Sequence, residues 1–332
     1  MYAKQLGTLL EFMLKENLPA LIKGAPGIGK SDVVEQACRE IGYKLIISHP
    51  VVADPTDYKG LPFAVGDEAK FLPFGDLKLL LETTEPLVYF LDDLGQATPA
   101  VQSAVMQLLL ARQINGHVIS PEVRFLAATN RREDRANVSG ILEPVKSRFA
   151  SIVELEVSVP DWVEWAWKHN MPGELVSFIQ FRPGLLNDFK ATRDIENSPC
   201  PRTVAFVGKM LRAGIPQTIK FETISGAAGE TFATEFIAYT NVYMELPTVA
   251  EIIDDPDSAK LPENVSGKYA IMGAIAGEMD VPNIKPLLRY LKRLGDEMTV
   301  AALKNVAMKN PKVCATREFV NWATANGDLF ML

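Results

Sequence analysis

The residues best suited to chemistry form a glycine-rich loop near the start of the chain. Residues 24–31 fit the pattern G-x-x-x-x-G-K-[ST] in full, with an apolar run before them and an amphipathic segment, 31–41, after them. In a strand–loop–helix unit of this kind, backbone N–H groups and the helix N-terminus converge on a phosphate. Lys30 would reach the β- and γ-phosphate oxygens, and the Ser31 hydroxyl would ligate Mg²⁺. The sequence therefore predicts a nucleoside triphosphate site formed by Gly24, Ala25, Pro26, Gly27, Ile28, Gly29, Lys30 and Ser31.

Two consecutive carboxylates extend this prediction. Asp92 and Asp93 follow the apolar run 87–91, which is typical of a buried strand. Ligands of parallel α/β sheets bind at the carboxyl ends of the strands. Asp92 is placed there to hold Mg²⁺ through a water, and Asp93 to orient and polarise the water that attacks in hydrolysis. The alternative is a plain strand-to-loop turn with two solvated aspartates.

Three further polar residues are candidates for the same site. Asn130 follows the next apolar run, where its amide would position the attacking water, although asparagine is also a common turn residue. Arg148, supplied from a neighbouring subunit, would stabilise charge that develops on the γ-phosphate. Arg202 opens a helical segment and would couple that segment to the nucleotide. For both arginines the alternative is a solvated surface side chain.

Apolar periodicity indicates which elements position these residues. Up to about residue 158, segments typical of strands alternate with segments typical of helices, which implies a parallel sheet covered on both faces. From about residue 160 the pattern is helical only. Within it, the bend 225–229 is interpreted as a structural lead-in to a helix rather than a hinge. The expected strands are 18–22, 44–48, 87–91 and 124–128, with a hairpin over 63–71; the expected helices are 2–16, 31–41, 76–82, 99–112, 161–169, 173–181, 203–213 and 229–246, with further helical segments in 269–332.

Composition narrows the class of protein. The chain has 332 residues, enough for two or three domains, and its net charge of −7 disfavours nucleic acid and anionic membranes as partners. No apolar run reaches the roughly 18 residues of a membrane span, and the first residues do not fit a signal peptide. Cys38, Cys200 and Cys314 are far apart in the sequence and are interpreted as reduced thiols. A cytoplasmic location is expected.

Taken together, these motifs resemble those of AAA+ ATPases, and more narrowly of the MoxR branch. Residues 24–31 resemble the Walker A loop and 87–93 the Walker B strand. The following segment, 94–102, resembles the MoxR family in its Ala, Pro and Val-Gln pair. In this resemblance Asn130 falls on the sensor 1 position, Arg148 on the arginine finger and Arg202 on the sensor 2 arginine.

The resemblance implies an α/β AAA+ P-loop core, a parallel sheet sandwiched by helices, followed by an all-α lid and a C-terminal helical region. The expected boundaries are 1–158 for the core, 159–247 for the lid, 248–261 for a linker and 262–332 for the C-terminal helical domain, which carries no family motif. It also implies ATP and Mg²⁺ as cofactors, with Asp93, Asn130, Arg148 and Lys30 as catalytic residues. Two inserts, at 54–71 and 113–122, would face the central pore of a hexamer.

Asp93 departs from the family pattern, which has Glu at this position. A carboxylate shorter by one methylene is withdrawn by about 1.5 Å, and catalysis is sensitive to such misplacement. Slow hydrolysis is therefore one expectation. The finger assignment has alternatives too, because Arg131, Arg132 and Arg135 lie close in sequence to Arg148.

Three functions follow from these expectations. The first is a ring-forming MoxR-like ATPase that couples ATP binding and hydrolysis to the remodelling or maturation of a protein client, with a von Willebrand factor A domain protein as partner. The second is a nucleotide-dependent assembly switch with little hydrolysis, which Asp93 favours. The third is a DNA-linked AAA+ protein, such as a clamp loader, against which the net charge stands. By mechanism, chelatase motor subunits are the nearest relatives.

Overall fold

The computed structural model describes residues 1–134, 140–190, 192 and 194–327. The chain divides into two compact units, Met1–Val157 and Ser158–Leu332, and each is described by itself. The finer boundaries expected at 247 and 261 stay predictions. The stretch predicted as a linker contains a short helix, α12 (Val249–Asp254).

The first unit is built on a five-stranded sheet in the order β2-β5-β8-β1-β9, and every neighbouring pair is parallel. The predicted α/β fold class and all four predicted strands are therefore confirmed, with shifts of one or two residues at some ends. The edge strand β9 was not predicted. It has four residues and no fully buried side chain, so its apolar signal is weak. The strands are β1 (Ala20–Lys23), β2 (Lys44–Ser48), β5 (Leu87–Leu91), β8 (Val123–Thr129) and β9 (Ser151–Glu154).

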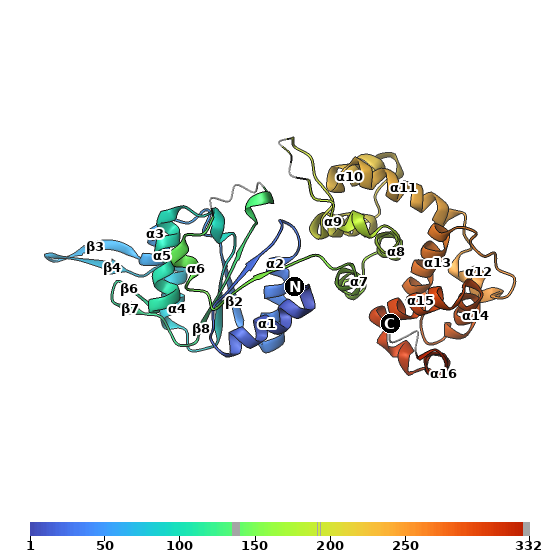
Figure 1. Cartoon of the computed structure of the whole chain (residues 1–332), viewed down its shortest axis with the longest axis horizontal. Helices are drawn as coiled ribbons and strands as arrows, with labels where there is room; N and C mark the ends of the chain where they lie inside the picture. Colours follow the sequence, from blue (N-terminus) through green and yellow to red (C-terminus); the bar gives the residue numbers. More distant parts are fainter. Residues whose placement is uncertain (135–139, 191, 193, 328–332) are drawn as a thin grey trace. The chain divides into compact units, whose positions relative to one another are not determined.

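Helices cover both faces of this sheet (Figure 1). Because successive strand residues point to opposite faces, Val88 and Phe90 pack with one helical layer, and Leu87, Tyr89 and Leu91 with the other. The first layer consists of α1 (Ala3–Lys15) and α2 (Lys30–Ile41); the second consists of α3 (Pro55–Lys59), α4 (Gly75–Glu82) and α5 (Pro99–Ala111). The sheet is thus buried on both sides, and this burial fixes the register in which neighbouring strands pair.

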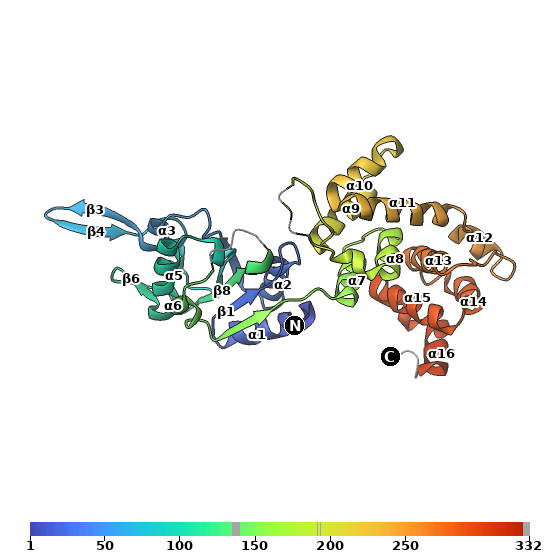
Figure 2. The same ribbon diagram turned by 45° about the horizontal axis from the view of Figure 1, so that its top comes forward.

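Two hairpins extend the first unit beyond the sheet. One pairs β3 (Leu61–Val65) with β4 (Glu68–Leu72), and Figure 2 shows it projecting from the body of the unit. The other pairs β6 (Gln113–Ile114) with β7 (His117–Val118). The hairpins touch, since the His117 ring nitrogen Nε2 lies 2.9 Å from the Phe71 carbonyl oxygen. Both hairpins coincide with the expected inserts.

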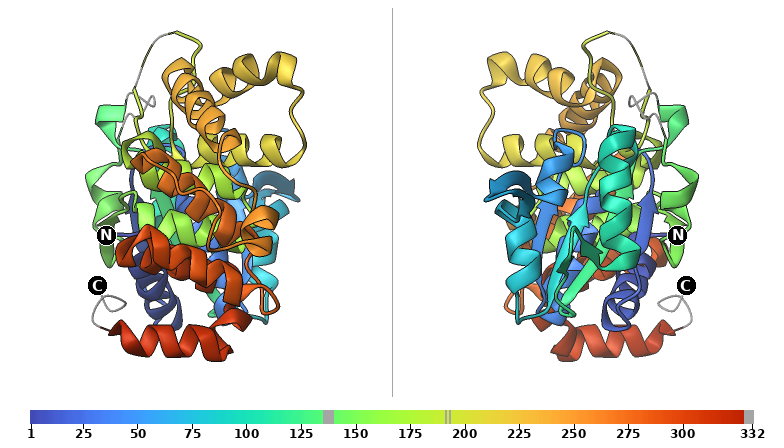
Figure 3. Two further views of the ribbon diagram at one scale, coloured as in Figure 1. Left: turned by 90° about the vertical axis from the view of Figure 1, so that its right-hand side faces the viewer. Right: turned by 90° about the vertical axis from the view of Figure 1, so that its left-hand side faces the viewer.

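The described part of the second unit contains helices and no strand, as predicted (Figure 3, left). Two helices, α10 and α12, were not predicted. The interpretation of 225–229 as a lead-in is wrong for residues 225–228, which form the last turn of α10, whereas Gly229 directly precedes α11. Small residues concealed the periodicity of α10, but Ile224 and Ala228 are fully buried. Its helices are α7 (Val159–Lys168), α8 (Gly173–Phe181), α9 (Pro201–Arg212), α10 (Lys220–Ala228), α11 (Glu230–Met244), α12, α13 (Val265–Glu278), α14 (Ile284–Leu294), α15 (Asp296–Lys309) and α16 (Arg317–Ala325).

Helices α8 and α13 approach each other closely at Gly273. A Cβ atom added there would lie 2.4 Å from Ser177 Oγ and 2.7 Å from the Gly173 carbonyl oxygen. We expect Gly273→Ala to destabilise the second unit by about 1–3 kcal/mol, because the packed helices must move apart. All four tryptophans lie in this unit, so tryptophan fluorescence during urea unfolding measures the change.

Gly277→Ala on the same helix is the matched control. An added Cβ there approaches only Lys309 Nζ, at 4.0 Å, and alanine is the better helix former. We expect unchanged or slightly raised stability. Equal unfolding midpoints for the two variants would contradict the packing argument.

Two other expectations concern the whole chain. In the part of the chain that the structure describes, no helix is long and apolar enough to span a bilayer. The three cysteines are free thiols, and burial raises the pKa of Cys38 to about 11. Cys38 is therefore a core residue rather than a nucleophile.

Candidate nucleotide site

The candidate site lies where three neighbouring parallel strands end. β1 ends at Lys23, β5 at Leu91 and β8 at Thr129, and the strand order places β8 between the other two. The residues that follow these ends are Gly24, Asp92 and Asn130, which therefore meet at one edge of the sheet. The Gly24 N–H donates to the Thr129 carbonyl across 3.2 Å and joins the glycine-rich loop to β8.

The loop owes its path to its glycines. Gly27 (φ 75°) and Gly29 (φ 93°) adopt left-handed backbone conformations that favour glycine. A Cβ atom added to Gly24 would lie 2.7 Å from Ile28 Cδ1 and 3.0 Å from the Leu155 carbonyl oxygen. Gly29 precedes α2, whose first residue is Lys30. The loop thus leads directly into a helix N-terminus, which is the arrangement that binds phosphates.

Lys30 is buried, with 7% of its surface exposed. Its ammonium donates to the carbonyl oxygens of Gly24 and Ala25, each at 3.0 Å, and to Asn130 Oδ1 at 2.7 Å. A buried ammonium with these partners is a fixed positive charge at the centre of the loop.

Ser31 and Asp92 form the candidate metal pair. The Ser31 hydroxyl donates to Asp92 Oδ2 at 2.7 Å, and Asp92 Oδ1 accepts from the backbone N–H of Asp93 at 3.0 Å. Hydroxyl and carboxylate oxygens suit Mg²⁺, which keeps waters and phosphate oxygens as its other ligands. Within the described residues, no cluster of three or more His, Cys, Asp or Glu offers an all-protein metal site.

Asp93 has a left-handed backbone (φ 56°, ψ 33°), a conformation that aspartate tolerates better than most residues. Its Oδ1 accepts from Asn130 Nδ2 at 3.0 Å. Asn130 is 8% exposed, so this contact is shielded from water. The structure therefore brings together five predicted residues, Lys30, Ser31, Asp92, Asp93 and Asn130.

Two of the candidate arginines, Arg131 and Arg148, form hydrogen bonds with residues other than these five. Arg131 forms a two-bond ion pair with buried Asp134, at 2.8 and 3.0 Å, and also reaches Glu154; the hydrogen bonds to Asp134 raise its pKa. Its charge is thus used within its own unit. Arg148 follows α6 (Glu143–Lys146) and donates from Nη1 to the Ser147 hydroxyl, while its buried Nε has no hydrogen-bond partner among the residues that the structure describes.

The other arginine-finger candidates are Arg132 and Arg135, and Arg202 is the candidate lid arginine. The side chain of Arg132 lies against Gly140, and Arg135 falls outside the described residues. Arg202 belongs to the second unit, in the first turn of α9. The assignment of Arg148 as the finger and of Arg202 as the lid arginine stays a prediction.

Gln102 has a structural role that the sequence did not predict. Only 1% of its surface is exposed. Its Nε2 donates to the carbonyls of Ala97 and Gly140, and its Oε1 accepts from the Leu142 N–H. Gln102 therefore ties α5 to the segment that leads into α6 and Arg148. Its place between apolar helix positions was the available signal, since a buried amide needs partners.

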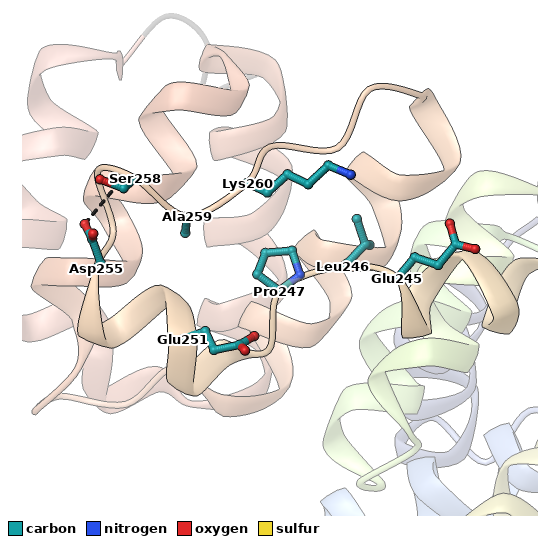
Figure 4. A pocket seen from close by; sticks show the side chains of 8 residues that line it. All are labelled: Glu245, Leu246, Pro247, Glu251, Asp255, Ser258, Ala259 and Lys260. Carbon is teal, nitrogen blue, oxygen red and sulfur yellow. Dashed lines mark hydrogen bonds between the residues drawn. The ribbon is translucent and has the colours of Figure 1, made fainter.

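A separate shallow hollow lies in the second unit, between the end of α11 and the segment after α12 (Figure 4). Two of its carboxylates are used in local caps: Glu251 accepts from the Thr248 N–H and Asp255 from the Ser258 N–H. It contains none of the predicted site residues. It is lined by Glu245, Leu246, Pro247, Glu251, Asp255, Ser258, Ala259 and Lys260.

Comparison with solved structures finds remote likenesses. A Thermotoga maritima RuvB P216G mutant aligns with 16% identity and a TM-score of 0.43, covering 72% of this chain and 69% of that one. The T. maritima RuvB Holliday junction branch migration motor aligns with 18% identity and a TM-score of 0.40, covering 72% of this chain and 69% of that one. NtrX from Brucella abortus in complex with ATP aligns with 13% identity and a TM-score of 0.39, covering 98% of this chain and 67% of that one.

Comparison with curated proteins gives no match. Comparison with family models gives one: residues 19–149 match the AAA domain (dynein-related subfamily). The matched segment runs from β1 to the end of the first unit's α6 region and includes every residue of the network described above. Residues 19–149 are therefore similar to this AAA domain, and they make up less than half of the chain.

Proposed function

We propose that this protein is a MoxR-like AAA+ ATPase that binds ATP with Mg²⁺, hydrolyses it and assembles into a ring. The observation that supports this most directly is the meeting of Lys30, the Ser31–Asp92 pair and Asp93 at one edge of a parallel sheet. A cation for phosphate, oxygens for Mg²⁺ and a carboxylate for water are the groups that phosphoryl transfer to water requires.

Each side chain has a distinct role in this proposal. The N–H groups of the glycine-rich loop and Lys30 would bind the phosphates, and Ser31 and Asp92 would hold Mg²⁺. When bound, Mg²⁺ would supply positive charge that offsets the charge of the phosphates. Asp93 accepts a hydrogen bond from the attacking water and orients it, and Asn130 holds Asp93 from the other side.

Arg148 completes the site of a neighbouring subunit in this proposal. Arg131 is held in an ion-pair network of its own unit. Arg148 donates a hydrogen bond to Ser147, and its buried Nε has no partner among the described residues. Arg148 is therefore the better candidate for a charge donated across an interface. Arg202 would make the second unit sense the nucleotide.

The same proposal gives the ring a protein client. The β3–β4 hairpin exposes apolar side chains, with Phe63 60% and Leu61 45% exposed, as protein-binding surfaces do. Hexameric assembly, client remodelling or maturation and a von Willebrand factor A domain partner are proposals drawn from the family resemblance. The net charge of −7 suits a protein client better than a nucleic acid.

A second candidate is an assembly switch with little turnover. The contact between Asp93 and Asn130 favours it, because a short carboxylate held at 3.0 Å by an amide is less available to a water. Steady-state ATP hydrolysis, measured beside light scattering with and without ATP, separates the candidates. Assembly on ATP without hydrolysis would support the switch and contradict the ATPase as stated.

A mixing experiment tests the shared site. Arg148→Ala and Asp93→Asn subunits are each expected to be inactive alone. Since each interface combines Asp93 of one subunit with Arg148 of the next, an equal mixture restores about a quarter of the interfaces. Activity in the mixture confirms that Arg148 acts in a neighbour's site. An inactive mixture, with rings still formed, contradicts that role.

A further inference from the structure

Helix α8 connects two predicted parts of the second unit. It belongs to the predicted lid, and it packs against α13 of the predicted C-terminal domain. A Cβ atom added to Gly273 of α13 would lie 2.7 Å from the Gly173 carbonyl oxygen at the start of α8. Helix backbones this close have the packing of a protein interior, where a shift of one helix strains the other.

A reciprocal amide pair crosses the same predicted boundary. Gln180 Nε2 of α8 donates to Asn305 Oδ1 of α15 at 3.1 Å, and Asn305 Nδ2 donates to Gln180 Oε1 at 2.9 Å. Asn305 is 1% exposed. A buried amide costs free energy whenever its partner is displaced, so this pair favours one fixed arrangement of α8 and α15.

The opposite side of α8 contacts other helices of the predicted lid. One of them is α9, which carries Arg202: a Cβ atom added to its Gly208 would lie 3.0 Å from Leu175 Cδ2 of α8. Another is α11, where the Tyr239 hydroxyl donates to Ser177 Oγ of α8 at 2.8 Å. The helix of Arg202 is therefore connected through α8 to α13 and α15.

The stretch predicted as a linker is fastened to α14. Arg293 Nη1 donates to the carbonyl oxygens of Pro256 and Ala259, at 2.7 and 2.9 Å. The Tyr290 hydroxyl donates to the Lys260 carbonyl oxygen at 2.7 Å. Few contacts are expected along a flexible linker between domains, so these bonds favour a structural segment instead.

We propose that the predicted lid, 159–247, and the predicted C-terminal domain, 262–332, form one rigid body that opens and moves as a whole. Residues 262–332 are then a rigid extension of the lid, and any displacement of α9 is carried through α8 to α13 and α15. The rigid body itself does not depend on hydrolysis. Its displacement by nucleotide, through Arg202, rests on the proposed function.

The test is hydrogen exchange of the backbone amides in the full chain, followed by mass spectrometry without nucleotide. Leu291→Ala removes a fully buried side chain from α14, which packs against α12, α13, α15 and α16. We expect the slowest amides of α8 and α9 to exchange about 30-fold faster or more, together with those of α13 and α14, because one opening exposes them all. Ile284→Val, a smaller truncation on the same helix, should give the same pattern at about 2- to 10-fold.

Lys292→Ala is the matched control, since Lys292 is the exposed neighbour of Leu291, and its exchange rates should equal those of the natural chain. Faster exchange in α13 and α14 with unchanged rates in α8 and α9, in either truncated variant, would show two domains that open separately. That result would overturn the proposal.

Addition of an ATP analogue that is not hydrolysed, with Mg²⁺, separates this proposal from the proposed function. A ligand that contacts a folded body slows the global opening of all its amides alike. We therefore expect slower exchange in α9 and α13 by the same factor. A response in α9 alone would contradict the rigid body. If neither helix responds while the variants behave as expected, the rigid body stands and nucleotide sensing by Arg202 does not.

Discussion

Lys30→Ala is expected to weaken ATP binding by about 100-fold or more, because it removes the charge-assisted hydrogen bonds to the phosphates. The ammonium is buried at the centre of the loop and is held by three acceptors, so no other cation replaces it without rebuilding the loop. Titration with a fluorescent ATP analogue, in the presence of Mg²⁺, measures the change.

Lys23→Ala is the matched control for this variant. Lys23 ends β1, directly before the loop, but its side chain is 46% exposed and pairs with Glu154 at 2.7 Å. Both variants remove one positive charge near the loop. Loss of the Lys23–Glu154 pair should not disturb the fold, because a partly exposed ion pair contributes little to stability. We expect a change of less than about threefold for Lys23→Ala. Similar losses in both variants would show that general charge, and not the position of Lys30, governs binding.

Asp93→Asn is expected to lower ATP turnover by about 100-fold or more while ATP still binds, because the general base is lost. Asparagine suits this test better than alanine. It keeps the shape of the side chain and tolerates the left-handed backbone at φ 56°, so stability should hold. Phosphate release and ATP affinity, measured on the same preparation, separate catalysis from binding.

Asp67→Ala provides the comparison, since Asp67 is an exposed carboxylate in the turn between β3 and β4. Its turnover should equal that of the natural chain. Full turnover in Asp93→Asn would exclude Asp93 as the base. Equal loss of binding and turnover would instead assign Asp93 to the binding of the nucleotide.

The sequence by itself determined the elements whose signals are local. The loop 24–31 carries its own glycines and is followed at once by a helix, so its conformation follows from adjacent residues. The run 87–91 is buried on both faces, and its unbroken apolar character marked its bounds without error. The carboxyl ends of neighbouring parallel strands meet at one edge of the sheet. The sequence alone therefore predicted that Asp92 and Asn130 lie near the loop.

Elements with weak local signals required the structure. β9 lies at the sheet edge with no fully buried residue, and α10 is rich in small residues, so neither shows a clear period. Both are stabilised by tertiary contacts: β9 pairs with β1, which is distant in sequence, and α10 packs against its neighbours α9 and α11. Tertiary packing overrides weak local propensity in such places.

The partners of each site residue were likewise decided by the tertiary structure. Lys30 and Asn130 lie 100 positions apart, and the sequence assigned both to phosphate and water without relating them to each other. The same holds for Arg131. From the sequence, Arg131 and Arg148 were both candidates for the arginine finger, and only the structure shows that Arg131 forms an ion pair with buried Asp134. Residue types and strand order determine which groups reach the site. Their hydrogen-bond partners depend on distances of a few tenths of an ångström, which only the folded chain sets.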